Sequence, residues 1–264
     1  MQTTIGVNGA CGRMGQRIVQ LAHTDHDLTI GAALENAGHP RLGRDIGEIA
    51  GIGRLDVPVT AAIPVNQKLD VMIDFSMPEG TMAVLPVCLE RQIPLVVATT
   101  GHTATQTAQI EAAAHHTAIL MAPSMSLVVN ILFKLVKEAS AILRDKGFDV
   151  EIIERHHRFK KDSPSGTALQ FAKIIQDAMA LDDIRHGREG LVGERPAKEI
   201  GMHAVRVGDN VGEHTIIFST LGETMELVHK GHTRDAYVRG ALLAAKFLAN
   251  RPAGRYSMED VLGL

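Results

Sequence analysis

The composition of this 264-residue chain excludes several classes of protein. Its formal net charge of −3 argues against a generally basic nucleic-acid binder, and the lack of tryptophan argues against binding by base stacking. No long uncharged apolar run predicts a membrane span, and the first residues lack the pattern of a signal peptide. Cys11 and Cys88 do not suggest a disulfide framework, so we expect a cytoplasmic protein with no membrane partner.

The chain begins with the pattern of a strand, a glycine turn and a helix. The β-prone run 3–8 leads into Gly9, Gly12 and Gly15, and apolar residues at helical spacing follow. The spacing G-x-x-G-x-x-G is a variant of the dinucleotide fingerprint, in which a helix N-terminus receives the pyrophosphate. Glu35 ends the next strand near the expected place of a ribose-binding carboxylate. The alternative is a glycine turn that only packs a strand on a helix.

The next segments alternate between strands and helices. After a segment rich in Gly, Pro and charge at 36–67, we expect strands at 71–75, 95–98 and 118–121, separated by helices. This alternation predicts a parallel sheet with helices on both faces, whose ligands lie beyond the carboxyl ends of the strands. The nominated loops are Gly9 to Met14, Phe75 to Met77, Ala98 to Thr100, and Ala122 to Met125.

The alternation of strands and helices ends after this region. A long helix is predicted at 127–143 from apolar spacing that includes Ile131 and Leu135, and a polar loop is predicted at 182–198. Three β-prone runs with short turns follow, and they favour an antiparallel or mixed sheet. The expected fold is an α/β, Rossmann-like parallel-sheet nucleotide-binding domain (1–126 plus 235–264). An inserted α+β domain (127–234) would contain the mixed or antiparallel sheet, and a last helix from Asp235 would return to the nucleotide-binding domain.

One stretch carries most of the chemistry: E-I-I-E-R-H-H-R-F-K-K-D-S-P-S-G-T-A-L, residues 151–169. It starts as a strand and ends as a helix, which Ser165 can cap and at which Gly166 allows close backbone approach. A helix N-terminus beside His156, His157 and Lys160 suits a carboxylate or phosphate and places proton donors next to it. The alternative is a solvated basic loop. A metal site is disfavoured, because adjacent histidines on a strand point to opposite faces and no second ligand motif is present.

These motifs together resemble the dihydrodipicolinate reductase family, also called 4-hydroxy-tetrahydrodipicolinate reductase, of lysine and diaminopimelate biosynthesis. The most specific match is E-R-H-H-R-F-K-K-D-S-P-S-G-T-A, which is similar to the family signature E-x-H-H-x-x-K-x-D-x-P-S-G-T-A. The start V-N-G-A-C-G-R-M-G and the segment 207–214 also resemble family segments. The chain departs from the family at Pro123-Ser124-Met125 and Phe159, and Lys161 adds a second amine beside Lys160.

The resemblance implies an oxidoreductase that reduces 4-hydroxy-tetrahydrodipicolinate or dihydrodipicolinate to tetrahydrodipicolinate with NADH or NADPH. The implied proton donor is His156 or Lys160. The substrate, a small cyclic dicarboxylate, would be held by His157, Ser165, Gly166 and Thr167. A homotetramer joined through the second domain's sheet is also implied. The cofactor-binding residues would be Gly9, Ala10, Cys11, Gly12, Arg13, Met14, Glu35, Asn36, Ala98, Thr99, Thr100, Ala122, Pro123, Ser124 and Met125.

Two alternatives stay open at this point. One is another NAD(P)H-dependent reductase that acts on a different imine or keto acid, and the other is a non-catalytic dinucleotide-binding protein. The cofactor preference is also open. Glu35 followed by Asn36 favours NADH, because a 2′-phosphate would meet a like charge, whereas Arg41 and Arg44 lie close enough in sequence to attract that phosphate.

Overall fold

The computed structural model describes residues 2–264 and divides into two compact units, each with its own sheet. The first unit contains the residues up to Leu127 together with Asp235–Leu264, and the second contains Val128–Arg234. In the described part of the chain, no helix combines the length and apolar character that crossing a membrane requires.

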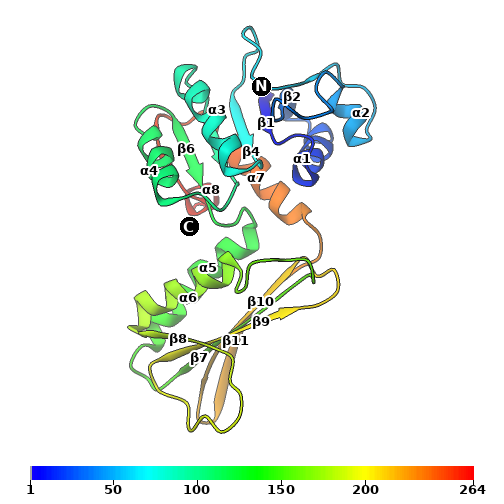
Figure 1. The fold of residues 1–264 in the computed structure, drawn as a ribbon. Helices are drawn as coiled ribbons and strands as arrows, with labels where there is room; N and C mark the ends of the chain where they lie inside the picture. Colours follow the sequence, from blue (N-terminus) through cyan, green and yellow to red (C-terminus); the bar gives the residue numbers. More distant parts are fainter. Residues whose placement is uncertain (1) are drawn as a thin grey trace. The chain divides into compact units, whose positions relative to one another are not determined.

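The first unit is built on a parallel sheet of seven strands in the order β12-β6-β5-β4-β1-β2-β3. Figure 1 labels β6, β4, β1 and β2 of this sheet. Every strand pairs in parallel with its neighbours, as the alternation of strands and helices predicted. All the carboxyl ends therefore lie at one edge of the sheet. The strands are β1 (Thr3–Asn8), β2 (Leu28–Leu34), β3 (Val59–Thr60), β4 (Val71–Asp74), β5 (Leu95–Val97), β6 (Ala118–Met121) and β12 (Gly254–Tyr256).

Helices cover both faces of this sheet and form two apolar cores. Along β5, Val96 belongs to one core whereas Leu95 and Val97 belong to the other, as strand alternation requires. Val96 lies in the core that holds apolar residues of α1 (Arg13–His23), α2 (Ile46–Ala50), α7 (Asp235–Leu248) and α8 (Met258–Leu262). The opposite core holds apolar residues of α3 (Pro78–Glu90) and α4 (Ala104–Ala113).

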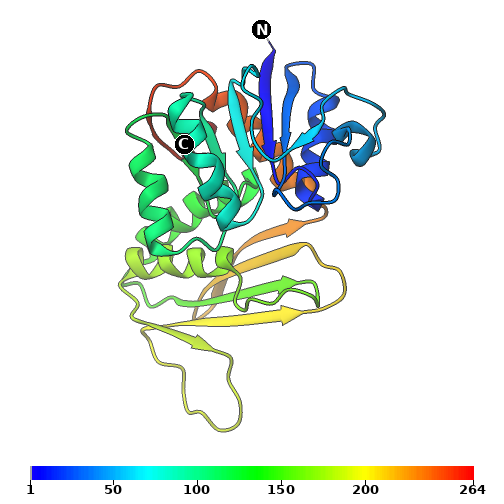
Figure 2. The ribbon, with the colours of Figure 1, turned by 45° about the horizontal axis from the view of Figure 1, so that its top comes forward.

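The second unit packs two helices on a mixed five-stranded sheet (Figure 2). Its strand order is β11-β10-β7-β9-β8, with antiparallel pairs on the β10 side and parallel pairs on the β9 side. Phe133 and Phe171 bring the two helices together over the sheet, with ring centroids 4.6 Å apart. The elements are α5 (Leu127–Leu143), α6 (Gly166–Met179), β7 (Asp149–His156), β8 (Asp183–His186), β9 (Glu199–Arg206), β10 (Gly212–Thr220) and β11 (Glu223–Gly231).

Some elements differ from the sequence-based prediction. The polar segment 182–198 contains strand β8, which the sequence analysis assigned to a loop because its residues Asp-Ile-Arg-His show no buried face. The predicted helix at 127–143 is confirmed, but Ile131 and Leu135 lie on its exposed side, at 41% and 44% exposure. The helix instead buries a stripe that includes Phe133 and Val136. Strand β12 and helix α8 were not predicted, because each is very short.

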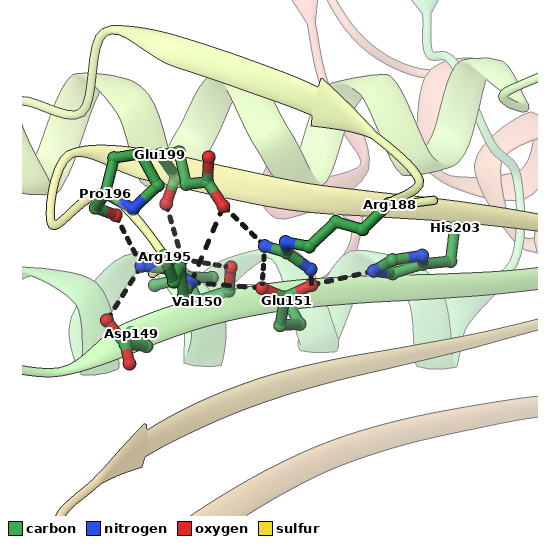
Figure 3. A network of polar contacts seen from close by, with 8 residues as sticks. All are labelled: Asp149, Val150, Glu151, Arg188, Arg195, Pro196, Glu199 and His203. Atoms are coloured by element: carbon green, nitrogen blue, oxygen red, sulfur yellow. Dashed lines mark hydrogen bonds and ion pairs between the residues drawn. The ribbon is translucent and has the colours of Figure 1, made fainter. Parts of the chain in front are cut away.

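A network of charges holds the loop between β8 and β9 against strand β7 (Figure 3). Arg188 contacts Glu151 at 2.7 Å and also pairs with the buried Glu199, while His203 Nε2 lies 2.7 Å from Glu151. A Cβ at Gly201, which pairs with Glu151 across the sheet, would lie 1.7 Å from that carboxylate. The glycine therefore makes room for the Glu151 side chain and its partners.

Candidate active site

The glycine turn after β1 is shaped for close approach of a ligand to the backbone. Gly9 has φ +76°, and a Cβ there would lie 2.6 Å from the carbonyl oxygen of Phe75. A Cβ at Gly15 would lie 2.2 Å from the carbonyl oxygen of Gly9, so this glycine lets α1 pack against the turn. Gly12 is the N-cap of α1, and among the described residues no side chain caps the helix there. The first N–H groups of α1 can therefore face a bound anion.

Glu35 lies directly against this turn. The backbone N–H of Cys11 donates to Glu35 Oε2 at 3.2 Å, and the N–H of Asn36 donates to Glu35 Oε1 at 3.2 Å. Asn36 Oδ1 in turn accepts from the N–H of Gly38 at 3.1 Å. The structure thus brings together the turn and the acidic residue that the sequence nominated for a pyrophosphate and a ribose.

A cavity of about 510 Å³ opens at the carboxyl ends of β1 and β2. Its volume is in the range of small-molecule sites in proteins. Of the described residues that line it, none is a lysine or an arginine, and two are acidic, Glu35 and Glu79. Its apolar lining comes from Leu34, Ala37, Ala61, Ala62, Ile63, Met77, Ala83, Val84 and Val87.

The ends of β1, β4 and β5 are tied together by a buried carboxylate, Asp74. It accepts from Asn8 Nδ2 at 2.8 Å and from the hydroxyl groups of Ser76 and Thr81 at 2.5 Å each. The N–H of Ser76 also donates to Thr99 Oγ1 at 2.9 Å. Sequence reasoning nominated Thr99 but assigned no role to Asp74, which fixes the strand-end loops relative to one another.

The other nominated loop residues differ in accessibility. Thr100 and Pro123 are exposed, Ala98 is half-buried, and Ala122, Ser124 and Met125 are buried. Met125 belongs to the core of the first unit, and a Cβ at Gly240 of α7 would lie 1.7 Å from its carbonyl oxygen. The Met125 side chain is therefore a packing residue, and this loop offers a ligand its backbone and the exposed residues beside it.

In the second unit, strand β7 ends in a buried pair of ionisable side chains. Alternation along the strand puts Glu154 and His156 on the same face, and Glu154 is completely buried. His156 Nδ1 lies 2.6 Å from Glu154 Oε2, and Arg206 of β9 donates two hydrogen bonds to the carboxylate at 2.7 and 2.8 Å. Burial raises the pKa of Glu154, but these hydrogen bonds outweigh it and lower the pKa to about 2. Glu154 is therefore ionised at neutral pH.

The same carboxylate reaches the start of helix α6. The N–H of Ser165 donates to Glu154 Oε1 at 3.0 Å, and Ser165 Oγ accepts from the N–H of Ala168 at 3.1 Å. The predicted N-cap at Ser165 is thus confirmed. Gly166 is exposed, and no heavy atom lies within 4 Å of a Cβ built on it. The helix N-terminus at Gly166 and Thr167 therefore borders open space within this unit.

Two buried histidines extend this cluster across the sheet. His214 of β10 pairs with Glu154 in register, and its Nε2 lies 3.2 Å from Ser165 Oγ. His229 of β11 pairs with His214 in turn, with Nδ1 atoms 3.5 Å apart. Burial, followed by the charge on His156 and His229, lowers the pKa of His214 to about 3, so this ring is neutral at neutral pH.

The remaining nominated residues lie in the loop after β7. Lys160 Nζ donates to Asp162 Oδ1 at 2.8 Å, and the Lys160 side chain is 21% exposed. His157 is half-buried, and its ring centroid lies 6.3 Å from that of Phe159. Sequence reasoning missed Glu154 and Arg206. The signal for Glu154 was its position two residues before His156 on a strand, whereas nothing local identifies Arg206.

Cys11, Glu35 and His39 are the one trio of potential metal ligands found among the described residues, with ligand atoms within 4.8 Å of one another. Burial, followed by the negative charge of Glu35, raises the pKa of the Cys11 thiol. Glu35 also accepts a hydrogen bond from the Cys11 N–H in the glycine turn, so one of its oxygens already contacts the backbone of the proposed nucleotide site.

Comparison with known proteins decides the family. The model of the N-terminal part of dihydrodipicolinate reductase matches residues 3–125, and the model of the C-terminal part matches residues 128–262. The chain belongs to the dihydrodipicolinate reductase family. The resemblance noted in the sequence is therefore confirmed, and the protein is a nicotinamide-dependent reductase of this family.

Relatives match the chain over nearly its whole length. The 4-hydroxy-tetrahydrodipicolinate reductase of Syntrophotalea carbinolica is 45% identical over 264 residues, covering 98% of both chains. The enzyme of the same name from Syntrophus aciditrophicus is 41% identical, covering 97% of both. Such identity over both units shows that the chain contains both parts of a dihydrodipicolinate reductase.

Solved structures show the same fold. The dipicolinate-bound dihydrodipicolinate reductase from Paenisporosarcina sp. TG-14 superposes with a TM-score of 0.77 at 24% identity, covering 97% of this chain and 98% of that one. An amine dehydrogenase from Mycobacterium smegmatis superposes with a TM-score of 0.66 at 12% identity, covering 98% and 95%. The predicted fold class, a Rossmann-like parallel sheet with a second mixed sheet, is confirmed.

Proposed function

We propose that this reductase converts 4-hydroxy-tetrahydrodipicolinate, by way of dihydrodipicolinate, into tetrahydrodipicolinate in lysine and diaminopimelate biosynthesis. Loss of water from the hydroxylated ring gives a conjugated C=C–C=N system, which takes up one hydride and one proton. The observation that carries the proposal is the cluster of His156 and Ser165 around Glu154. This cluster places a proton donor beside a helix N-terminus that can bind a carboxylate. Relatives of the chain are named for the same activity.

The first unit fits a nicotinamide dinucleotide. Glycines at 9, 12 and 15 allow the pyrophosphate to approach the start of α1, and Glu35 is available to the adenosine ribose. When bound, NADH or NADPH supplies the hydride. Residues Gly9, Ala10, Cys11, Gly12, Arg13 and Met14 would hold the pyrophosphate, and Glu35 with Asn36 would hold the ribose. The nicotinamide end would contact Ala98, Thr99, Thr100, Ala122, Pro123, Ser124 and Met125.

The second unit would bind the cyclic dicarboxylate. Ser165, Gly166 and Thr167 at the start of α6 offer backbone N–H groups and a hydroxyl to one carboxylate, and the positive helix end favours its charge. His157 and Lys160 offer hydrogen-bond donors to the second carboxylate.

His156 is the preferred proton donor in this mechanism. Its Nδ1 is held by Glu154, which leaves Nε2 as the atom that can reach a substrate. Proton transfer from Nε2 to the reduced ring would leave a neutral imidazole whose Nδ1–H still donates to the carboxylate. Lys160 is the alternative donor, with Asp162 as its partner.

The cofactor site favours NADH while allowing NADPH. Two acidic residues, Glu35 and Glu79, line the cavity, and a 2′-phosphate near Glu35 would meet a like charge. Arg41 and Arg44 oppose this bias, because both act electrostatically on Cys11 in the glycine turn and are thus near enough to influence a phosphate. We therefore expect dual use with a preference for NADH.

The assembly we propose is a homotetramer in the cytoplasm, joined through the sheet of the second unit. Val205 of β9 and Val228 of β11 are 39% and 42% exposed in the single chain, which supports burial of this sheet against another copy. Cys11 and Cys88 are both free thiols, which agrees with a reducing compartment.

The proposal is tested by mixing the purified protein with freshly generated substrate and NADH or NADPH and following nicotinamide absorbance. Turnover with this substrate, and none with acyclic imines or keto acids, is the expected result. Turnover only with acyclic imines or keto acids would show that the protein has a different reductase activity. Cofactor binding without turnover of any of them would indicate a dinucleotide-binding protein.

A further inference from the structure

The buried Glu154 carboxylate has hydrogen-bond partners on three different elements. Oε2 faces His156 Nδ1 at 2.6 Å and accepts from Arg206 Nη1 at 2.8 Å. Oε1 accepts from the N–H of Ser165 at 3.0 Å and from Arg206 Nη2 at 2.7 Å. Both oxygens are thus occupied by donors from the end of β7, the start of α6 and strand β9. A buried group in contact with so many donors has one allowed orientation.

This arrangement determines which nitrogen of His156 carries its proton. An ionised carboxylate can only accept, so Nδ1 must donate to Glu154, and in the neutral ring Nε2 has no hydrogen. In the protonated ring Nε2 carries the transferable proton, and after transfer the ring relaxes to the Nδ1–H form without changing its contact with Glu154. The carboxylate also stabilises the positive charge of the protonated ring.

The same carboxylate also positions the start of α6. Its bond to the N–H of Ser165 fixes the residue whose hydroxyl caps the helix, and the next residues are Gly166 and Thr167. Any displacement of Glu154 therefore moves the proton donor and the helix N-terminus together. Arg206 braces the carboxylate from β9, and it also donates to the carbonyl oxygen of Asp162 in the intervening loop at 2.7 Å.

We propose that Glu154 is a positioning residue that holds His156 in the tautomer needed for proton donation and holds the helix N-terminus at Ser165 beside it. This inference rests on the proposed function, since it gives the donor role to His156. Glu154 itself does not contact the substrate; it acts through the two residues to which it is bonded.

The charged and titratable groups around Glu154 and His156 come from every neighbouring element. Arg206 lies on β9, His214 on β10, His229 on β11 and Lys160 in the loop after β7. His214 is neutral at neutral pH and adds no positive charge. The cation that is bonded directly to the Glu154 carboxylate is Arg206. An uncharged amide at position 154 would therefore leave the Arg206 guanidinium without its counter-charge and His156 without its anionic acceptor.

Glu154→Gln is the decisive variant, because the geometry favours one orientation of the new amide. An NH₂ in the place of Oε1 would face two donors, Ser165 N–H and Arg206 Nη2. In the place of Oε2 the NH₂ would face only one such donor, Arg206 Nη1, and could donate to His156 Nδ1, so this orientation is the favoured one. The neutral imidazole must then carry its proton on Nε2. Proton donation from Nε2 instead requires a ring that returns to the Nδ1–H form.

Glu151→Gln is a matched control. Glu151 lies on the same strand and is likewise bonded to two arginines, Arg188 and Arg195, and to a histidine, His203 (Figure 3). Its side chain lies outside the proposed site, in the network that holds the loop between β8 and β9. Both variants remove one arginine-paired carboxylate from β7, and thermal unfolding reports the loss of stability of each, because Glu154 is fully buried whereas the Glu151 side chain is 22% exposed. A positioning effect lowers kcat in Glu154→Gln alone.

Two readouts are measured on the full-length enzyme after thermal unfolding has shown that each variant is folded. Nitrogen NMR shifts of the histidine rings, with the His156 signals identified by their absence in His156→Gln, report the tautomer. Steady-state kinetics report kcat and its pH profile. We expect Glu154→Gln to move the proton to Nε2 and to lower kcat on the order of 10²-fold with KM for NADH unchanged. The alkaline limb of its pH profile should also move to lower pH.

Glu154→Asp provides a second test, because it keeps the charge at a shorter reach. It should keep the Nδ1–H tautomer and recover part of kcat, even where Glu154→Gln folds poorly. An unchanged tautomer or an unchanged kcat in folded Glu154→Gln would overturn the proposal, as would an equal kcat loss in Glu151→Gln. Failure of the wild-type enzyme to reduce the dicarboxylate would instead reject the proposed function, and the tautomer measurement would still decide whether Glu154 holds His156.

Discussion

Glu35 is bonded to the backbone of Cys11, with the Cys11 N–H donating to Glu35 Oε2 at 3.2 Å. The acidic residue at the end of β2 is thereby fixed against the glycine turn that follows β1. A carboxylate in this position accepts hydrogen bonds from ribose hydroxyl groups and repels a 2′-phosphate. The cofactor preference of the enzyme is therefore open to change through the residues beside Glu35.

Asn36→Arg should shift the preference toward NADPH. Asn36 lines the cavity next to Glu35, and an arginine there would place a guanidinium fork beside the proposed ribose site, where it could bind a 2′-phosphate. The measurement is kcat/KM for both cofactors at several salt concentrations, since an exposed arginine–phosphate contact weakens with salt. Gln109→Arg, an equal change of charge on the exposed side of α4, should leave the ratio unaltered. No shift in Asn36→Arg would mean that this loop does not approach the ribose.

His156→Gln should lower kcat far more than it weakens cofactor binding. Loss of a general acid typically costs about 10²–10⁴-fold in rate. Steady-state kinetics of this variant and of Lys160→Met, assayed side by side, will distinguish the two candidate donors. A larger kcat loss in Lys160→Met, with His156→Gln close to wild type, would transfer the donor role to the lysine.

Thr167→Val should weaken dicarboxylate binding while NADH binding stays nearly intact. Thr167 lies in the first turn of α6, where its hydroxyl and N–H can face a carboxylate, and valine keeps the shape without the hydroxyl. Calorimetry with dipicolinate and with NADH, each titrated alone, makes the cofactor the internal control. Equal losses for the two ligands would contradict the assignment of this helix N-terminus to the substrate.

Acid should destabilise the protein in two stages. His214 has a folded-state pKa of about 3 against an ordinary 6.5, so its contribution to stability is complete above pH 6.5 and is lost as the pH falls toward 3. Glu154 has a folded-state pKa of about 2 against an ordinary 4.5, so its contribution is lost as the pH falls from 4.5 toward 2. Each proton taken up only on unfolding contributes a slope of about 1.4 kcal/mol per pH unit.

Urea unfolding of wild type and His214→Gln between pH 7 and pH 3 tests the first stage. The free energy of unfolding of the variant should change less between pH 6.5 and 4.5, while the fall below pH 4.5 remains. His23→Gln, at the exposed end of α1, should keep the wild-type slope. Parallel curves for wild type and His214→Gln over the whole range would show that His214 does not control this transition.

Gly15→Ala should destabilise the protein and impair cofactor binding. The added Cβ would lie 2.2 Å from the carbonyl oxygen of Gly9, so α1 and the turn must separate, at a cost of about 1–3 kcal/mol typical of overpacking. Gly166→Ala introduces the same atom at a helix start with no neighbour within 4 Å, and its stability should stay near wild type. Denaturant midpoints for both variants, with NADH titrations of Gly15→Ala, check this contrast.

The sequence determined those features that depend on neighbouring residues. The glycines around Cys11, the carboxylate at Glu35 and the cap at Ser165 were all predictable, because turns, strand ends and helix caps depend on local backbone geometry. The alternation of strands and helices likewise predicted a parallel sheet, since parallel strands require crossover connections. The motif around His156 indicated the family, and the family comparisons confirmed that resemblance.

Only the tertiary structure decided which distant side chains complete the site. Arg206 and His214 meet Glu154 because β9 and β10 flank β7 in a particular register, and a register set by packing across the sheet cannot be read from local patterns. Strand β8 was missed for the same reason, since its polar residues become a strand only by pairing with β9. The buried side of α5 depended on the sheet beneath it, because its residues are apolar on more than one side and only contact with β7 and α6 selects which of them are buried.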